Sequence, residues 1–175
     1  MIDRIKTYAP HAIAVFASVV FLDSLRFKFT NAPETQVIFG KLNDWAATLG
    51  AEGLFAQTGL FSQYTIGTAE LVAASLLLIG IHPAFRRLQA IGSMIAVAVM
   101  TGAISFHLFT PLGIDPNNDG GGLFVAATIV WTSSLAMLVI RRREIIGLIR
   151  DLGAAFLPQG LPVSRPDGPA ASLAI

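Results

Sequence analysis

Residues 122–140 read GLFVAATIVWTSSLAMLVI, an uninterrupted run without a charged side chain. A helix needs roughly 20 mostly apolar residues to cross the hydrocarbon core of a bilayer. Three further stretches, at about residues 9–29, 59–81 and 88–109, have the same character. A transmembrane β-barrel would instead show segments of about 10 residues with alternating polarity. The sequence therefore predicts an all-α, polytopic membrane protein built as a four-transmembrane-helix bundle.

The composition of the whole chain agrees with this prediction. Of the 175 residues, 54% are hydrophobic and only 13% are charged. A soluble domain is about 25% charged, so too little polar surface remains to cover a soluble globule. The chain contains no cysteine, which rules out disulfides and thiol redox chemistry on this chain. A net charge of +1 argues against nucleic acid as a partner.

Lysine and arginine gather on one side of the predicted spans. The connections 30–58 and 110–121 together hold only Lys41. Because positive residues favour the cytoplasmic side, we expect a multi-pass protein of the bacterial cytoplasmic (inner) membrane with both termini in the cytoplasm. The bilayer is then the first partner. The basic residues that flank the cytoplasmic ends of the spans are Arg4, Lys6, Arg86, Arg87, Arg141, Arg142, Arg143 and Arg150.

The segments outside the spans carry their own signals. Residues 31–34, Asn-Ala-Pro-Glu, are typical of a helix start, because proline fits the first turn and glutamate suits the positive helix end. Apolar residues then follow at helical spacing, so we expect a short amphipathic helix in the first outer loop, with Trp45 as its interfacial anchor. Residues 141–152 are expected to continue the last helix. Residues 1–152 would form one transmembrane domain, and residues 153–175 a flexible cytoplasmic tail.

Several ionisable residues lie in or beside the outer halves of the spans. Such groups cost about 2.5–3.5 kcal/mol at the centre of a span and are functional candidates by default. Outward-running spans bring Asp23, Arg26 and His107 to similar depth, and Glu70 meets them from a span that runs inward. We predict that these four line one polar pocket, whereas Lys28 extends towards the headgroups. The full candidate set is Asp23, Arg26, Lys28, Glu70, His107 and Asp119.

Other interpretations of these residues stay open. A buried network of paired charges can simply fix the register of the helices. No similar cluster lies at the opposite ends of the spans, where the run 141–143 is interpreted as a topology signal. Gly102 is predicted to allow close helix packing. No metal site is predicted and no cofactor motif is evident, since phosphate loops, nucleophile elbows and HExxH motifs are all missing from the sequence.

Three stretches resemble the DoxX family of small four-span membrane proteins. They are RFKFTNAPET at residues 26–35, IGTAELVAASLLLI at 66–79, and AVMTGAISFHLFTPLGI at 98–114 followed by Asp119 and two glycines. The resemblance covers about residues 19–143 and implies a four-helix transmembrane bundle. It also implies that Arg26, Lys28, Glu70, His107 and Asp119 match polar positions of the family pattern. Some relatives are subunits of a thiosulfate:quinone oxidoreductase, and others resemble membrane partners of thiol-handling proteins. Without cysteine, any thiol chemistry would belong to a partner or a substrate.

Three functions compete on this evidence. The first is a non-catalytic accessory or scaffold subunit that assembles with other membrane subunits or with itself, and it is the one we expect. The second is a component of a quinone-linked oxidoreductase, in which Glu70 or His107 hydrogen-bonds the quinone and Arg26 stabilises its reduced form. The third is a small-anion carrier that uses Arg26 and Lys28, with proton coupling at Glu70. We do not expect the chain to be an enzyme by itself.

Overall fold

The computed structural model describes residues 2–156, and within this range it contains helices and no strand. The predicted all-α class is confirmed. The predicted tail lies mostly outside the described residues, except that residues 153–156 belong to the last helix. The helices are α1 (Ile2–Phe29), α2 (Pro33–Thr48), α3 (Gln63–Ile79), the short 3-10 helix η1 (Pro83–Phe85), α4 (Arg86–Phe109), α5 (Gly122–Ile140) and α6 (Arg142–Phe156).

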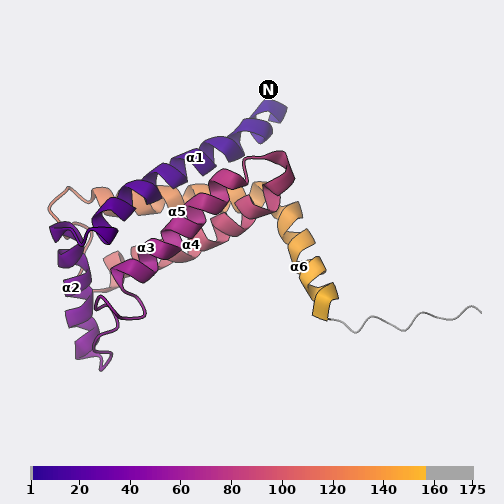
Figure 1. The fold of residues 1–175 in the computed structure, drawn as a ribbon. Coiled ribbons are helices and arrows are strands. Elements are labelled where there is room, and N and C mark those ends of the chain that lie inside the picture. Colours follow the sequence, from indigo (N-terminus) through magenta and orange to yellow (C-terminus); the bar gives the residue numbers. More distant parts are fainter. Residues whose placement is uncertain (1, 157–175) are drawn as a thin grey trace, which may run out of the picture.

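Four long helices, α1, α3, α4 and α5, form an up-down-up-down bundle (Figure 1). Each helix packs on the next, and α5 returns to α1 through the least extensive of the four contacts. Small residues keep the helices close, because a Cβ on Gly92 of α4 would lie 3.0 Å from backbone atoms of Ala73 and Leu77 in α3. The prediction for Gly102 was wrong, since a Cβ there would meet only Phe106, at 4.0 Å. The central core contains Ala14, Ala17, Phe21, Ala73, Leu77, Ala96, Val130 and Met137.

Two helical stretches in the described part of the chain are long and apolar enough to cross a membrane, Pro83–Phe109 and Gly122–Ile140. The second coincides with the predicted span. Helix α3 is apolar but has only 17 residues, because it begins at Gln63 rather than near residue 59. Ser62 fixes this start, since its hydroxyl accepts a hydrogen bond from the N–H of Thr65 at 3.2 Å. By length and composition, therefore, two of the four predicted spans meet the requirement for crossing.

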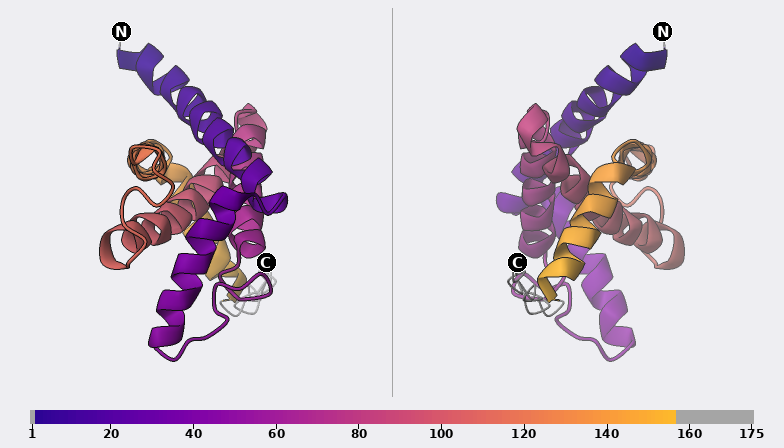
Figure 2. Two further views of the ribbon diagram at one scale, coloured as in Figure 1. Left: turned by 90° about the vertical axis from the view of Figure 1, so that its left-hand side faces the viewer. Right: turned by 90° about the vertical axis from the view of Figure 1, so that its right-hand side faces the viewer.

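Helix α2 covers one end of the bundle (Figures 1 and 2). It corresponds to the helix predicted in the first outer loop. Its buried face, Leu42 and Ala46, packs against Phe55 and Leu112 of the neighbouring loops in a second apolar core. Trp45 packs edge-on against Phe106 of α4, with the ring centroids 6.5 Å apart. The helix is thus joined to the bundle by aromatic contacts.

Helix α6 turns away from α5 at the opposite end of the bundle (Figure 1). The prediction of one continuous helix was wrong, because the Arg141 side chain turns inward at the junction. Its Nε and Nη2 donate to Oε1 of the fully buried Gln89 at 2.9 and 2.6 Å. Burial lowers the pKa of Arg141, the Glu144 carboxylate opposes this, and Arg86 adds to the lowering. Arg141 is therefore a buried junction residue, and this end of the bundle has a polar cluster that the sequence analysis missed.

Candidate functional site

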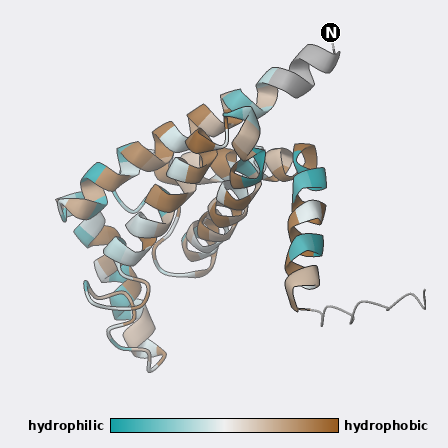
Figure 3. Cartoon of the chain, turned by 45° about the vertical axis from the view of Figure 1, so that its right-hand side comes forward, coloured by the Kyte–Doolittle hydropathy of each residue, from teal (hydrophilic) through white to brown (hydrophobic). Residues whose placement is uncertain are grey.

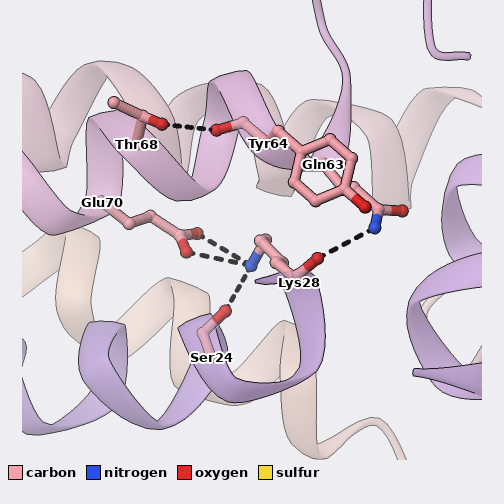
Figure 4. A network of polar contacts seen from close by, with 6 residues as sticks. All are labelled: Ser24, Lys28, Gln63, Tyr64, Thr68 and Glu70. Carbon is pink, nitrogen blue, oxygen red and sulfur yellow. Dashed lines mark hydrogen bonds and ion pairs between the residues drawn. The ribbon is translucent and has the colours of Figure 1, made fainter. Parts of the chain in front are cut away.

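A buried ion pair joins α1 to α3 near the end covered by α2 (Figure 4). Lys28 Nζ lies 3.1 Å from Glu70 Oε1 and 3.0 Å from Oε2. The side chains are only 15% and 4% exposed, respectively. Lys28 Nζ also donates to the Ser24 hydroxyl one turn earlier in α1. The ammonium group therefore has two partners inside the protein, which offset part of the cost of removing it from water.

Hydrogen bonds at the start of α3 hold Lys28 in this position (Figure 4). Gln63 Nε2 donates to the Lys28 carbonyl at 2.9 Å and to the Asn31 side-chain oxygen at 3.0 Å. Asn31 has φ of 53°, a left-handed conformation that asparagine tolerates better than most residues and that ends α1. The first turn of α3 is thereby fixed to the last turn of α1. One helical turn further along α3, Gly67 lets the Phe29 ring of α1 come close, since a Cβ on Gly67 would lie 3.4 Å from this ring.

Two cavities have Glu70 in their walls. Cavity A, of about 430 Å³, lies between α2, α3 and α4. Cavity B, of about 660 Å³, lies between α1, α2, α4 and α5. Both are lined by Thr35, Ile38, Glu70, Ala103 and His107. The remaining wall of cavity A includes Lys28, Phe39, Phe55, Phe61, Gly102 and Phe106.

His107 lies on the walls of both cavities and is 8% exposed. Its Nδ1 donates to the Gly113 carbonyl at 2.6 Å, so the proton on Nδ1 is fixed and Nε2 is the nitrogen that can accept. The edge of the Phe124 ring meets the imidazole at a centroid distance of 5.7 Å. His107 therefore also ties the loop that follows α4 to the bundle.

The structure separates Arg26 from the predicted pocket. Arg26 Nε lies 2.9 Å from Asp23 Oδ1, but the two side chains are 67% and 59% exposed. The guanidinium group lies over the Phe27 ring, 4.5 Å from its centroid. Asp23 reaches the rim of cavity B, whereas Arg26 lines neither cavity. The structure therefore places Lys28, and not Arg26, on the wall of a cavity together with Glu70 and His107.

Asp119 lines cavity B and caps α5. Its Oδ1 accepts hydrogen bonds from the N–H groups of Gly121 and Gly122 at 3.0 and 3.1 Å, and its Oδ2 from Leu123 at 3.2 Å. Partial burial raises the pKa of Asp119, but hydrogen bonding to Asp115 and to these three N–H groups outweighs it and leaves the pKa below its ordinary value. Asp119 therefore satisfies N–H groups in the first turn of α5 that have no partner within the helix.

The site as built is an apolar chamber with few polar groups. Lys28, Glu70 and His107 are the ionisable side chains on the wall of cavity A, Thr35 adds a hydroxyl, and the rest is apolar. Within the described residues, no group of three His, Cys, Asp or Glu side chains is placed to hold a metal ion. Such a chamber suits a lipophilic molecule with a small hydrogen-bonding head.

Sequence reasoning missed the aromatic wall and the polar residues that support Lys28. Phe55 and Phe61 come from a loop without regular structure, and Phe55 meets Phe106 edge-on at 5.2 Å. Ser24 stands four residues before Lys28 on one helix face, a spacing that was available as a signal. Comparison of the chain with protein-family models, with curated proteins and with solved structures finds no match.

Proposed function

We propose that this chain is a DoxX-like protein of the bacterial cytoplasmic membrane that crosses the bilayer four times, with both termini in the cytoplasm. One observation carries the proposal: large apolar side chains are exposed on the outside of all four long helices. They include Val15, Phe16, Val19 and Leu22 on α1, Leu71, Val72 and Ile79 on α3, Met94 and Leu108 on α4, and Val125, Ile129 and Val139 on α5.

Burial in the two most apolar helical stretches supports the same proposal. Each of these stretches contains an 18-residue apolar segment. Only 28% of the segment in Pro83–Phe109 and 22% of the segment in α5 is buried inside the protein. The core helix of a soluble protein would be mostly buried, whereas a span faces lipid over most of its surface. Figure 3 shows the hydrophobic colour recurring along the long helices. An apolar surface of this extent needs a bilayer or a partner to cover it.

The lengths of the other two helices are compatible with crossing. Helix α1 has 28 residues and α3 has 17, which correspond to roughly 42 and 26 Å at 1.5 Å per residue. A hydrocarbon core is about 30 Å thick, and a short helix is accommodated at modest cost by local thinning. The charges of Lys28 and Glu70 are compatible with a span because they face each other inside the bundle.

Within the membrane, we propose that the protein is an accessory or scaffold subunit of a larger complex. Support comes from a single small bundle, from the absence of a metal cluster among the described residues, and from a polar site whose members are engaged in structural contacts. Purification from native membranes in mild detergent, followed by mass spectrometry, tests this. We expect stoichiometric partner subunits. A lone chain, recovered under conditions that keep an unrelated membrane complex intact, would contradict it.

Cavity A favours a second candidate, a quinone-binding component of an oxidoreductase. Its volume of about 430 Å³ lies in the range of ligand sites, about 300–1,000 Å³, and its wall is mostly apolar. Lys28 would donate to a carbonyl oxygen of the quinone, His107 Nε2 would accept from a hydroxyl of the reduced form, and Glu70 would hold the counter-charge. In this proposal Lys28 takes the place first assigned to Arg26.

Tryptophan fluorescence tests the quinone proposal directly. The chain has two tryptophans, and Trp45 contacts Phe106 in the wall of cavity A. In a Trp131→Phe background, a short-chain quinone should quench Trp45 saturably. Gly102→Leu fills cavity A and should weaken quenching at least tenfold. The control is the same substitution at Gly40, where a Cβ meets nothing within 4 Å, and it should leave the quenching of Trp45 unchanged. Quenching that does not saturate, or that is equal in both variants, would exclude the site.

A further inference from the structure

Helix α6 has an apolar face that nothing in the described part of the chain covers. No residue of α6 is buried. Ile149, Leu152 and Phe156 are 67%, 62% and 82% exposed and recur three and four residues apart, as one face of a helix requires. Isolated exposed apolar residues are common, but a continuous helical face of this kind marks an interaction surface.

The opposite face of α6 is held to the start of α4. Arg87 Nη1 lies 2.7 Å from Asp151 Oδ2, and Arg87 Nη2 lies 3.4 Å from the Cβ position of Gly147, one turn earlier. The buried Arg141 fixes the junction with α5. Helix α6 therefore leaves the end of the bundle across the direction of the long helices (Figure 1). Its apolar face points away from Arg87, because Asp151 and Gly147 lie on the opposite side of the helix.

Positive charge surrounds this helix. The arginines at this end of the bundle are Arg86, Arg87, Arg141, Arg142, Arg143 and Arg150, whereas α6 carries only Glu144 and Asp151 as acids. Both acids already face arginines, Glu144 at 3.6 Å from Arg141 and Asp151 at 2.7 Å from Arg87. The excess of arginine disfavours docking of a second α6 and suits a surface of anionic headgroups.

We infer that α6 is an interfacial helix that binds the anionic leaflet at the bundle's cytoplasmic end. Its apolar side chains enter the boundary between headgroups and acyl chains, and its arginines contact lipid phosphates. The inference rests on the proposed membrane crossing only in that α5 must end at the bilayer surface. A helix bound in this way anchors the connection between α3 and α4 through Arg87 and Asp151.

Because the chain has no cysteine, single spin labels test this in the full-length protein. Leu152→Cys and Ala154→Cys form a matched pair, since residues two apart in a helix lie on opposite faces. In vesicles of phosphatidylglycerol and phosphatidylcholine, we compare how accessible each spin label is to oxygen, which is apolar, and to a water-soluble nickel complex. The ratio of the first accessibility to the second should be severalfold higher at residue 152 than at residue 154. With phosphatidylcholine alone, or with Arg142→Gln and Arg143→Gln, this difference should shrink.

A label at Ile129→Cys, in the middle of α5, separates the two proposals. If residue 129 is in lipid and residue 152 is as exposed to water as residue 154, the inference on α6 is wrong and the proposed crossing stands. If residue 129 is exposed to water, the proposed crossing itself fails. Dipolar broadening between labels at residue 152 of two molecules would show that a second copy covers this face and would overturn the lipid assignment.

Discussion

The ammonium group of Lys28 and the carboxylate of Glu70 depend on each other because both are withdrawn from solvent. An exposed pair such as Arg26 and Asp23 contributes about 0.2–1 kcal/mol at most, since water screens it. Removing one partner of a buried pair is different, because the remaining charge loses its counter-charge but stays buried. At the scale of single residues, this pair is therefore the most sensitive point of the candidate site.

We expect Glu70→Gln to lower the free energy of unfolding by about 3 kcal/mol, as is typical of breaking a buried pair. The double variant Lys28→Met with Glu70→Leu should recover most of this loss, because no charge then remains buried. Unfolding by SDS titration in detergent micelles measures both. Arg26→Gln is the control and should change stability by less than about 0.5 kcal/mol. Equal effects of Glu70→Gln and Arg26→Gln would contradict burial of the pair.

A second prediction at this scale concerns Asp119 and pH. Asp119→Ala removes the cap of α5 and should cost about 1 kcal/mol at neutral pH. The pKa of Asp119 is lowered in the folded protein, so its contribution is complete above the unfolded-state pKa of about 3.9 and is lost as the pH falls through the lower folded value. The stabilities of wild type and Asp119→Ala should therefore converge as the pH falls below the ordinary pKa range of an aspartate. A difference that widens on acidification would reverse this assignment.

At the scale of the elements, Gly92 permits a close approach of α4 to α3. The Cβ position of Gly92 lies 3.0 Å from the Ala73 carbonyl oxygen and the Leu77 nitrogen, and backbone atoms cannot yield as a flexible side chain can. Gly102, on the same helix, borders cavity A instead. Two glycines of one helix thus have opposite roles, one in packing and one in leaving space.

Substitution of these glycines by alanine separates the roles. Gly92→Ala should lower stability by about 1–3 kcal/mol through overpacking between α3 and α4. Gly102→Ala should be neutral or gain up to about 1 kcal/mol, because alanine favours a helix more than glycine does. The thermal midpoint in detergent compares the two variants directly. A loss at position 102 as large as that at position 92 would contradict the packing described for α4.

At the scale of the whole molecule, α2 lies at one end of the bundle and α6 at the other (Figure 1). The proposed crossing places α2 with its neighbouring loops outside the cell and η1 with α6 in the cytoplasm. The buried Arg141–Gln89 contact and the Lys28–Glu70 pair lie at these opposite ends. The two polar clusters would then lie near opposite surfaces of the bilayer.

Single cysteines test this topology on intact cells. A membrane-impermeant maleimide should label Gln57→Cys and Ile114→Cys directly, because both positions are exposed in the loops beside α2. Ala84→Cys in η1 and Arg143→Cys in α6 should react only after permeabilisation. Labelling of residue 84 in intact cells would overturn the four-span arrangement.

The sequence by itself determined the helical class, the limits of α5 and the presence of a helix after Pro33, because apolar runs and local helix signals act over a few residues. Only the tertiary structure decided which charges are buried. Residues 26–29 alternate between a cation and a phenylalanine, Arg-Phe-Lys-Phe. The sequence alone therefore does not tell which of the two cations faces the interior of the bundle. Each residue turns a helix by 100°, and the packing of α3 and α5 against α1 sets which face is inside. The same holds for Arg141, which is followed in the sequence by two further arginines and whose burial depends on Gln89, 52 positions away.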